Sequence, residues 1–302
     1  MPDQAPGIKA IDVVCNFELA DPELERPEWS KNFITKKIGS PDSLLGRFTA
    51  EGFVDYMEEA GVEHAFLIAV RAGSYLNRIS REVPYEKVAD VVQAHPERFS
   101  GLAGVDPTRG MRGVRELERA VKEYGFVGAH LYPHWFEQPP DAARYYPYYA
   151  KCCELDIPIQ MQVGHCLRYS DERPLASVAH PVTLDRIACD FPELKLVGIH
   201  IGWPWTEEMI SVAYKHPNVY IGSDAYGPSH WPEAFVHFID SWGQDKVLFG
   251  TDFPVIEPGR ALREIAELEI RPTSRAKFLR DNAISLYGLD LPLSQVSSAG
   301  GA

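Results

Sequence analysis

Apolar residues gather in eight short runs along the chain, and several of the runs are almost continuous rather than alternating. A strand buried on both faces of a parallel sheet has this pattern, whereas a strand with one face in water alternates apolar and polar side chains. The runs predict strands within residues 8–17, 64–70, 99–106, 126–133, 157–164, 195–202, 218–224 and 247–254.

Segments with helical spacing separate these runs. In residues 113–125 the apolar positions Val114, Leu117, Ala120 and Val121 recur at spacings of three and four, with charged residues on the opposite face. Further examples of helical segments lie at 48–61, 143–156 and 184–191.

The alternation of strands and helices predicts the fold class. Eight strand-helix units of this length fit an α/β protein with a single (β/α)8 TIM barrel. We expect the barrel to span residues 1–290 and residues 291–302 to form a flexible tail.

The first unit carries an extended loop, residues 18–47, after its strand. Such a loop leaves the carboxyl end of a strand, where barrel enzymes have their active sites, so we expect a lid or a subunit contact; a passive surface excursion is the alternative.

Composition narrows the function classes. The 302 residues include 43 Asp and Glu against 30 Lys and Arg, a formal net charge of −13, and 45% of them are hydrophobic. The apolar content excludes a disordered chain, and the acidic balance argues against binding to nucleic acid or to an anionic membrane. The five cysteines form no CxxC pair, so we expect reduced thiols. We therefore expect a cytoplasmic protein that acts on a small molecule, with no nucleic-acid or membrane partner.

The predicted carboxyl ends of the strands are rich in histidine. Four of the ten histidines lie at these ends: His130, His134, His165 and His200. Asp252 follows the last strand, and Asp224, after the seventh strand, is expected to form a turn. In a TIM barrel these ends converge on the active site, and imidazole together with carboxylate suits a Zn, Mn or Fe site.

Four strings of residues resemble a known family. They are GFVGAHLYPHW (125–135), YYPYYAKCCELDIPIQMQVGH (145–165), LKLVGIHIGW (194–203) and VLFGTDFP (247–254). They are similar to the amidohydrolase-related family of the aminocarboxymuconate-semialdehyde-decarboxylase type, and the resemblance covers nearly the whole chain. It implies a barrel enzyme that uses a metal to hydrolyse or decarboxylate its substrate.

The family's metal-ligand pattern is only partly present. Where members have a His-x-His pair on the first strand, this chain has Val14 and Asn16, and Gln162 stands in place of the histidine on the fifth strand. His200 and Asp252 match the family's positions on the sixth and eighth strands. Valine cannot ligate a metal, and an amide oxygen is a poor replacement for imidazole at a zinc site. The resemblance thus implies a rearranged site.

The rearranged site has a definite set of candidate residues. We expect one divalent metal (Zn, Mn or Fe) held by His130, His200 and Asp252, with a metal-free site as the alternative. Asp252, His200 and His165 are the expected catalytic residues, and Asp252 would move the proton. Residues expected to contact the substrate are Asn16, Tyr132, His134, Gln162 and Trp203.

Three functions stay open at this point. The first is metal-assisted hydrolysis or decarboxylation of a small organic substrate, with an aromatic compound as one candidate. The second is a non-catalytic or metal-poor subunit of a hetero-oligomeric metalloenzyme, such as an amine N-hydroxylase-type oxygenase. The third is a metal-free hydrolase that uses acid and base groups. The expected assembly is a homo-oligomer, or a hetero-oligomer with a paralogous barrel subunit.

Overall fold

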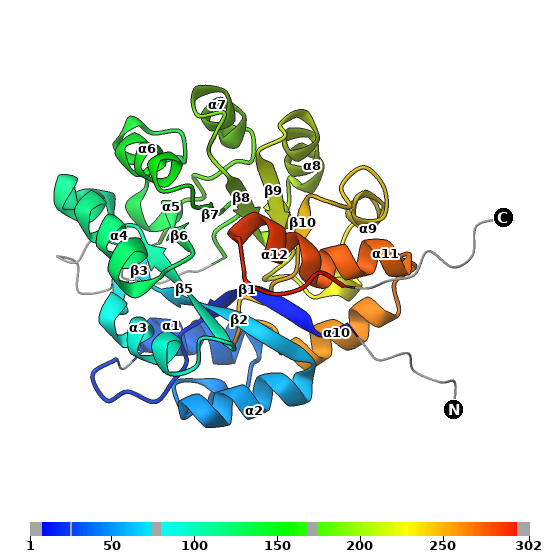
Figure 1. Ribbon diagram of the computed structural model, residues 1–302, viewed down its shortest axis with the longest axis horizontal. Helices are drawn as coiled ribbons and strands as arrows, with labels where there is room; N and C mark the ends of the chain where they lie inside the picture. The colour runs from blue at the N-terminus through cyan, green and yellow to red at the C-terminus, as the bar shows by residue number, and fades with distance from the viewer. Residues whose placement is uncertain (1–7, 25, 74–79, 168–173, 295–302) are drawn as a thin grey trace.

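Eight parallel strands form the centre of the molecule (Figure 1), in the order β1-β2-β5-β6-β7-β8-β9-β10. The structure is a computed structural model, and it describes residues 8–24, 26–73, 80–167 and 174–294. The strands of this sheet are β1 (Ala10–Asn16), β2 (Val62–Ala69), β5 (Phe99–Gly104), β6 (Gly128–Leu131), β7 (Ile159–Gln162), β8 (Leu196–Ile199), β9 (Val219–Gly222) and β10 (Val247–Leu248).

The sheet closes on itself between its first strand and the chain that follows its last. The backbone N–H of Val13 donates to the carbonyl of Phe249 at 3.0 Å, and the N–H of Asn16 donates to the carbonyl of Phe253 at 3.0 Å. Cys15 forms a parallel bridge with Phe253. These contacts confirm the predicted single (β/α)8 TIM barrel. The boundary at residue 290 stays a prediction, and residues 295–302 of the expected tail lie outside the described residues.

Helices surround the barrel (Figure 1). The α-helices are α1 (Glu28–Asn32), α2 (Ala50–Ala60), α3 (Tyr85–Ala94), α4 (Met111–Tyr124), α5 (Pro133–Phe136), α6 (Tyr146–Glu154), α7 (Thr183–Asp190), α8 (Thr206–Lys215), α9 (Glu233–Ile239), α10 (Pro258–Ala266), α11 (Pro272–Ala276) and α12 (Asn282–Tyr287). Short 3-10 turns cover Asp42–Leu44, Pro107–Arg109, Ala143–Tyr145, His200–Gly202 and Pro228–His230, and π-helical turns cover Phe33–Ile38 and Lys277–Asp281.

Local sequence explains where the helices begin, end and pack. The hydroxyl of Thr49 caps α2 by accepting a hydrogen bond from the N–H of Gly52. Gly61 ends the same helix at φ 90°, a conformation that favours glycine. Helix α4 buries Val114 and Leu117 against the barrel, as its spacing predicts, because these residues fall on one face.

The extended loop after β1 contains helix α1 and the π-helical turn Phe33–Ile38. Trp29 of α1 packs against Trp135 of α5, with 4.8 Å between the ring centroids. This contact holds the loop against the carboxyl ends of the strands, because α5 directly follows β6. A second insertion forms a short antiparallel hairpin from β3 (Arg71–Ala72) and β4 (Arg81–Glu82), which the sequence pattern did not predict.

None of the helices in the described part of the chain combines the length and the apolar character that a membrane crossing needs.

The buried carboxyl group of Asp12 links the first strand of the barrel to the segment that follows the last strand. Asp12 in β1 is fully buried. It accepts hydrogen bonds from the backbone N–H groups of Val14 and Thr251, both at 3.1 Å, and from the hydroxyl of Thr251. Burial raises the pKa of Asp12 from 3.8 to about 7, although these hydrogen bonds oppose the shift. Asp12 thus anchors the segment that carries Asp252.

The raised pKa of Asp12 predicts a pH-dependent stability difference for Asp12→Asn. Because the pKa is higher in the folded state than in the unfolded state, the native protein loses stability as the pH rises from about 4 to 7, by as much as about 4 kcal/mol from this group. The asparagine variant lacks this titration. Its stability relative to the native protein should therefore increase over that interval and stay constant above it, as measured by urea unfolding at several pH values. A stability difference between the two proteins that does not change with pH would contradict the raised pKa of Asp12.

Candidate active site

Three polar side chains meet at the carboxyl ends of neighbouring strands. His200 follows β8, Asp224 lies just after β9, and Asp252 lies in the turn after β10. His200 Nε2 is 3.3 Å from Asp224 Oδ2 and 3.8 Å from Asp252 Oδ2. One ligand atom from each residue lies within 4.8 Å of the other two. We call these three residues the His-Asp-Asp group.

Unusual backbone conformations position the His-Asp-Asp group. His200 has φ 66° and Asp252 has φ 52°, in the left-handed region that non-glycine residues rarely adopt. The predicted strand at 247–254 ends at Leu248, and the turn that follows directs Asp252 into the barrel mouth instead of continuing the strand. Such conformations concentrate at functional sites, where the surrounding fold enforces them.

Asp224 is the member that the sequence pattern missed. Its side chain is fully buried, and its Oδ1 accepts a hydrogen bond from the backbone N–H of His200 at 3.0 Å. Its Oδ2 has no hydrogen-bond donor among the described residues. Burial, together with the negative charge of Asp252, raises the pKa of Asp224 well above its ordinary value. Two adjacent carboxylates with this little solvent are stable only with a proton or a cation between them.

The donor set of the His-Asp-Asp group therefore fits a divalent metal ion. One imidazole and two carboxylates form a ligand set that suits Mn, Zn or Fe. His200 and Asp252 belong to the predicted ligand set, and Asp224 is the third side chain that this geometry brings to the same place. Which residues bind a metal stays a prediction.

His130 lies outside the His-Asp-Asp group. Its Nδ1 is 2.9 Å from Nε2 of Gln160, an amide nitrogen that can only donate, so the ring proton sits on Nε2. Gln160 is in turn fixed by the hydroxyl of Tyr287, which donates to its Oε1 at 2.8 Å. Burial lowers the pKa of His130 to about 3, so the ring is neutral. This geometry gives no support to His130 as a metal ligand.

Asn16 supports Asp252 from the neighbouring strand. Its amide nitrogen donates to Asp252 Oδ1 at 2.8 Å and to the carbonyl of Phe253 at 2.9 Å. The carbonyl of Phe253 identifies the atom beside Asp252 as the amide nitrogen of Asn16. The amide oxygen of Asn16 in that position would face two acceptors and no donor. Asn16 thus orients the carboxylate, and its predicted contact with substrate stays a prediction.

A small cavity opens beside the His-Asp-Asp group. Its volume is about 50 Å³, which has room for only a few water molecules. The residues that line it are Phe33, Ile38, Gln162, His165, Cys166, Leu167, His200, Ala225, Tyr226, Asp252 and Val255. Phe33 and Ile38 come from the extended loop, so this loop lies over the cavity, and its role as a lid stays a prediction. The Lys37 ammonium donates to the carbonyl of Leu167 at 2.7 Å, and the Ser40 hydroxyl donates to that of Pro254 at 2.7 Å.

The other predicted site residues divide between the cavity and its surroundings. Gln162 and His165 line the cavity. The ring of His165 meets that of Trp203 edge-on, with 5.9 Å between centroids. Tyr132 is buried against the ring of His130, with centroids 4.3 Å apart. His134 is also buried; its Nδ1 accepts from the N–H of Val178 at 3.1 Å, and burial lowers its pKa to about 4. Tyr132, His134 and Trp203 are thus neighbours of the site rather than part of the cavity lining.

Arg81 contributes a positive charge that the sequence pattern did not indicate. It comes from hairpin strand β4 and is 8% exposed. Its guanidinium donates to the carbonyl of Phe17 at 3.3 Å and lies 3.5 Å from Glu18 Oε1. Burial lowers the pKa of Arg81 to about 10, against the opposing influence of Tyr132 and Asp252. The charge of Arg81 is therefore within electrostatic reach of Asp252.

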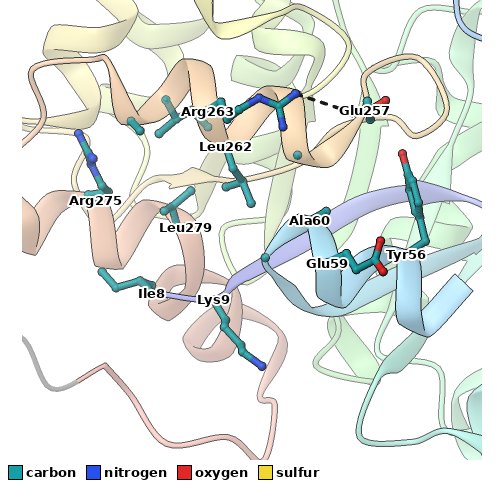
Figure 2. Close-up of a pocket in the computed structure, with 14 residues that line it drawn as sticks. Ile8, Lys9, Tyr56, Glu59, Ala60, Glu257, Leu262, Arg263, Arg275 and Leu279 are labelled. Carbon is teal, nitrogen blue, oxygen red and sulfur yellow. Dashed lines mark ion pairs between the residues drawn. The ribbon is translucent and has the colours of Figure 1, made fainter. Parts of the chain in front are cut away.

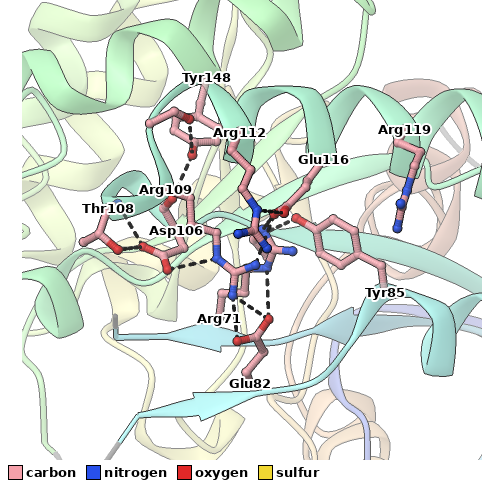
Figure 3. A network of polar contacts seen from close by, with 12 residues as sticks. Arg71, Glu82, Tyr85, Asp106, Thr108, Arg109, Arg112, Glu116, Arg119 and Tyr148 are labelled. Atoms are coloured by element: carbon pink, nitrogen blue, oxygen red, sulfur yellow. Dashed lines mark hydrogen bonds and ion pairs between the residues drawn. The ribbon is translucent and has the colours of Figure 1, made fainter. Parts of the chain in front are cut away.

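A separate polar network lies at the end of β5 (Figure 3). Asp106 accepts hydrogen bonds from Thr108 and from Nε of Arg109 at 3.2 Å. Arg109 also pairs with Glu82 at 2.7 Å and with Glu116 at 3.2 Å. These partners satisfy the carboxylate of Asp106, and the network joins the β3-β4 hairpin to α4. Its role is to hold the hairpin that carries Arg81.

A larger hollow of about 660 Å³ lies on the outside of the barrel, between α2 and α10 (Figure 2). It sits beside the amino-terminal ends of β1 and β2, because Lys9 and Gly61 line it. The ion pair between Arg263 and Glu257, at 3.9 Å, crosses its rim. The residues that line it include no histidine or cysteine. The smaller cavity, at the opposite end of the strands, is therefore the better candidate for the active site.

The fold and the site together define a class of protein. A closed (β/α)8 barrel with one histidine and two aspartates at its strand ends has the architecture of a TIM-barrel enzyme with a metal-type ligand set. The family follows from direct comparison. Residues 38–289 match the family model described as amidohydrolase, and the chain belongs to this family.

Curated relatives of the chain are lyases of organic acids. The chain is 25% identical over 288 residues to a gamma-resorcylate decarboxylase of Polaromonas sp. (strain JS666), which covers 78% of this chain and 86% of the relative. It is 34% identical over 134 residues to a 2-keto-4-carboxy-3-hexenedioate hydratase of Sphingobium sp. (strain SYK-6), and this match spans only 38% of the chain and 38% of the hydratase. These relatives and the family identify the chain as an enzyme.

Solved structures agree with the fold. A TIM-barrel protein from Bordetella bronchiseptica has a TM-score of 0.77 and 26% identity, covering 93% of this chain and 98% of that one. A dihydroxybenzoic acid decarboxylase from Polaromonas sp. JS666, solved with manganese and the inhibitor 2-nitroresorcinol, has a TM-score of 0.65 and 20% identity, covering 94% of this chain and 98% of that one.

Proposed function

We propose that this protein is a metal-assisted carboxy-lyase, which removes CO2 from a small organic acid with an aromatic or conjugated carbon skeleton. The observation that carries the proposal is the His-Asp-Asp group, whose ligand atoms lie within 4.8 Å of one another at the mouth of the barrel. Relatives named as decarboxylases of aromatic acids support this choice of reaction.

His200, Asp224 and Asp252 would hold the metal. When bound, a divalent cation supplies positive charge that stabilises the negative charge which develops on the substrate. Manganese is the ion to test first, because the Polaromonas decarboxylase was solved with it. Asn16 fixes the direction of Asp252 through the 2.8 Å hydrogen bond, so the carboxylate is oriented before substrate arrives.

The proton balance points to a role for His165. Decarboxylation breaks one carbon–carbon bond, releases CO2 and leaves an electron pair on the carbon, which must take up one proton. His165 lines the same cavity as His200 and Asp252. Histidine is the common proton carrier at neutral pH, so we assign the delivery of this proton to His165. Asp252, which the sequence favoured for that step, is engaged by Asn16 and His200.

The charged groups near the site and the volume of the cavity limit which substrates can bind. The buried guanidinium of Arg81 interacts electrostatically with Asp252, but it pairs with Glu18 at 3.5 Å and lies outside the cavity lining, so it supplies at most a long-range attraction for an anionic substrate. The cavity of about 50 Å³ is smaller than the roughly 150 Å³ that accommodates benzene in an engineered protein cavity. The loop that carries Phe33 and Ile38 must therefore move away for an aromatic acid to enter, and its return would exclude water.

The test is CO2 release from a panel of acids. Chelator-treated protein is supplied with Mn²⁺ and incubated with hydroxybenzoates and unsaturated dicarboxylates, and in parallel with ester and amide substrates. We expect CO2 release from at least one class, its loss on chelation and its return with Mn²⁺. Hydrolysis of esters or amides without CO2 release would replace the carboxy-lyase proposal with a hydrolase, and a mass gain of one water on an unsaturated acid would indicate a hydratase. Activity that survives exhaustive chelation would support the metal-free alternative.

A further inference from the structure

A second set of metal-ligating side chains lies on the outer face of the barrel. Asp185 and Cys189 are four residues apart on α7, so they lie on one face of that helix. His216 directly follows α8 and reaches the same place. One ligand atom from each of the three residues lies within 4.8 Å of the other two.

The three side chains already face one another. His216 Nε2 lies 2.7 Å from Asp185 Oδ1, although only 10% of the His216 side chain is exposed. Zinc takes sulfur at about 2.3 Å and imidazole nitrogen at about 2.0–2.1 Å, so two ligands of one tetrahedral ion are roughly 3.3–3.7 Å apart. Cys189 is exposed and Asp185 is partly exposed, so both can make the small adjustment that closes the set.

The donor atoms of Asp185, Cys189 and His216 determine which metal ion they prefer. A thiolate, an imidazole and a carboxylate form a borderline-soft donor set, which suits Zn²⁺ and excludes Ca²⁺ and Mg²⁺, because these ions require oxygen ligands. The His-Asp-Asp group has no sulfur donor, so the two places differ in the ions they prefer.

Lys215 competes with a metal at this place. Its ammonium is 2.6 Å from Asp185 Oδ1, and its side chain is 58% exposed, so it can turn into solvent.

We propose that Asp185, Cys189 and His216 form a second, peripheral site for Zn²⁺, with water as the fourth ligand. The ion joins α7 to the end of α8, the two helices that precede and follow β8. Binding therefore stabilises the fold around β8, the strand that His200 directly follows. This site is independent of the carboxy-lyase proposal, because it shares no residue with the His-Asp-Asp group.

The test is a titration of the chelator-treated full-length protein with Zn²⁺ and with Cd²⁺, which reports a thiolate ligand by its ultraviolet charge-transfer absorption. We expect the absorption band and a Zn²⁺-dependent rise in melting temperature in the native protein. Cys189→Ser should remove the band and weaken Zn²⁺ binding at this site by about 100-fold or more. Lys215→Met should tighten it about fivefold, because a competing positive charge is gone.

Cys166→Ser is the matched control, because Cys166 lines the active-site cavity, where a metal would otherwise find a thiol. This variant should keep the band. Loss of the band in Cys166→Ser and its retention in Cys189→Ser would overturn the proposal, as would Zn²⁺ binding that is equal in Cys189→Ser and the native protein. Because Cys189 is exposed, its replacement leaves the fold intact, which circular dichroism verifies.

Discussion

Replacing Asp252 with asparagine is expected to lower the rate of CO2 release by about 1000-fold while the barrel stays folded. The substitution removes one of the two negative charges that would balance the metal. The introduced asparagine would keep the hydrogen bond from the amide of Asn16, which is 2.8 Å long in the native site, because its own side-chain oxygen can accept. The loss would therefore come from charge rather than from a rearranged turn. Steady-state kinetics and metal content, measured on the same samples, check this expectation.

Asp245→Asn is the matched control for Asp252→Asn. Asp245 pairs with Lys277 at 2.7 Å on the surface and is 65% exposed, so its replacement should change the rate less than twofold. The two variants make the same chemical change at a carboxylate that is 13% exposed and at one that is 65% exposed. If Asp252→Asn retained a tenth or more of the native rate, the His-Asp-Asp group would not be the reaction centre.

The barrel could be predicted from the sequence because the patterns that mark its strands and helices are local. Continuous apolar runs mark strands buried on both faces, and the helical spacing of Val114 and Leu117 is a property of one helix. His200 and Asp252 were also accessible, because strand ends converge in this fold and because both match the family's positions. Their proximity, 3.8 Å between Nε2 and Oδ2, agrees with that reasoning.

The remaining features of the site depend on tertiary contacts that no local pattern contains. Asp224 has the sequence context of a turn, and only its full burial beside His200 distinguishes it. His130 has the context of a strand-end ligand, but Gln160 turns its ring so that Nδ1 accepts a hydrogen bond. Arg81 comes from an insertion outside the strand-helix repeat, so its electrostatic interaction with Asp252 had no signal in the periodicity.

Glu18→Gln is expected to destabilise the protein by about 3–5 kcal/mol. Glu18 is 2% exposed and pairs with two buried arginines, Arg26 and Arg81. It also accepts a hydrogen bond from the N–H of Gly46 at 3.1 Å. Glutamine keeps the size of the side chain but leaves both guanidinium groups buried without this counter-charge. Urea unfolding should show the loss as a lower midpoint with an unchanged slope.

Asp42→Asn separates the effect of burial from the effect of charge. Asp42 pairs with Arg47 in the same loop, but both side chains are 62% exposed, so its replacement should cost less than about 1 kcal/mol. A further variant, Glu18→Gln with Arg26→Met, removes one of the uncompensated charges and should recover part of the loss.

Glu18 lies two residues after Asn16 and joins the start of the loop to Gly46 near its end. If Glu18→Gln also raises the KM for the acid substrate, whereas Asp42→Asn does not, the buried ion pairs hold the loop in place over the cavity; equal KM values would limit their role to stability.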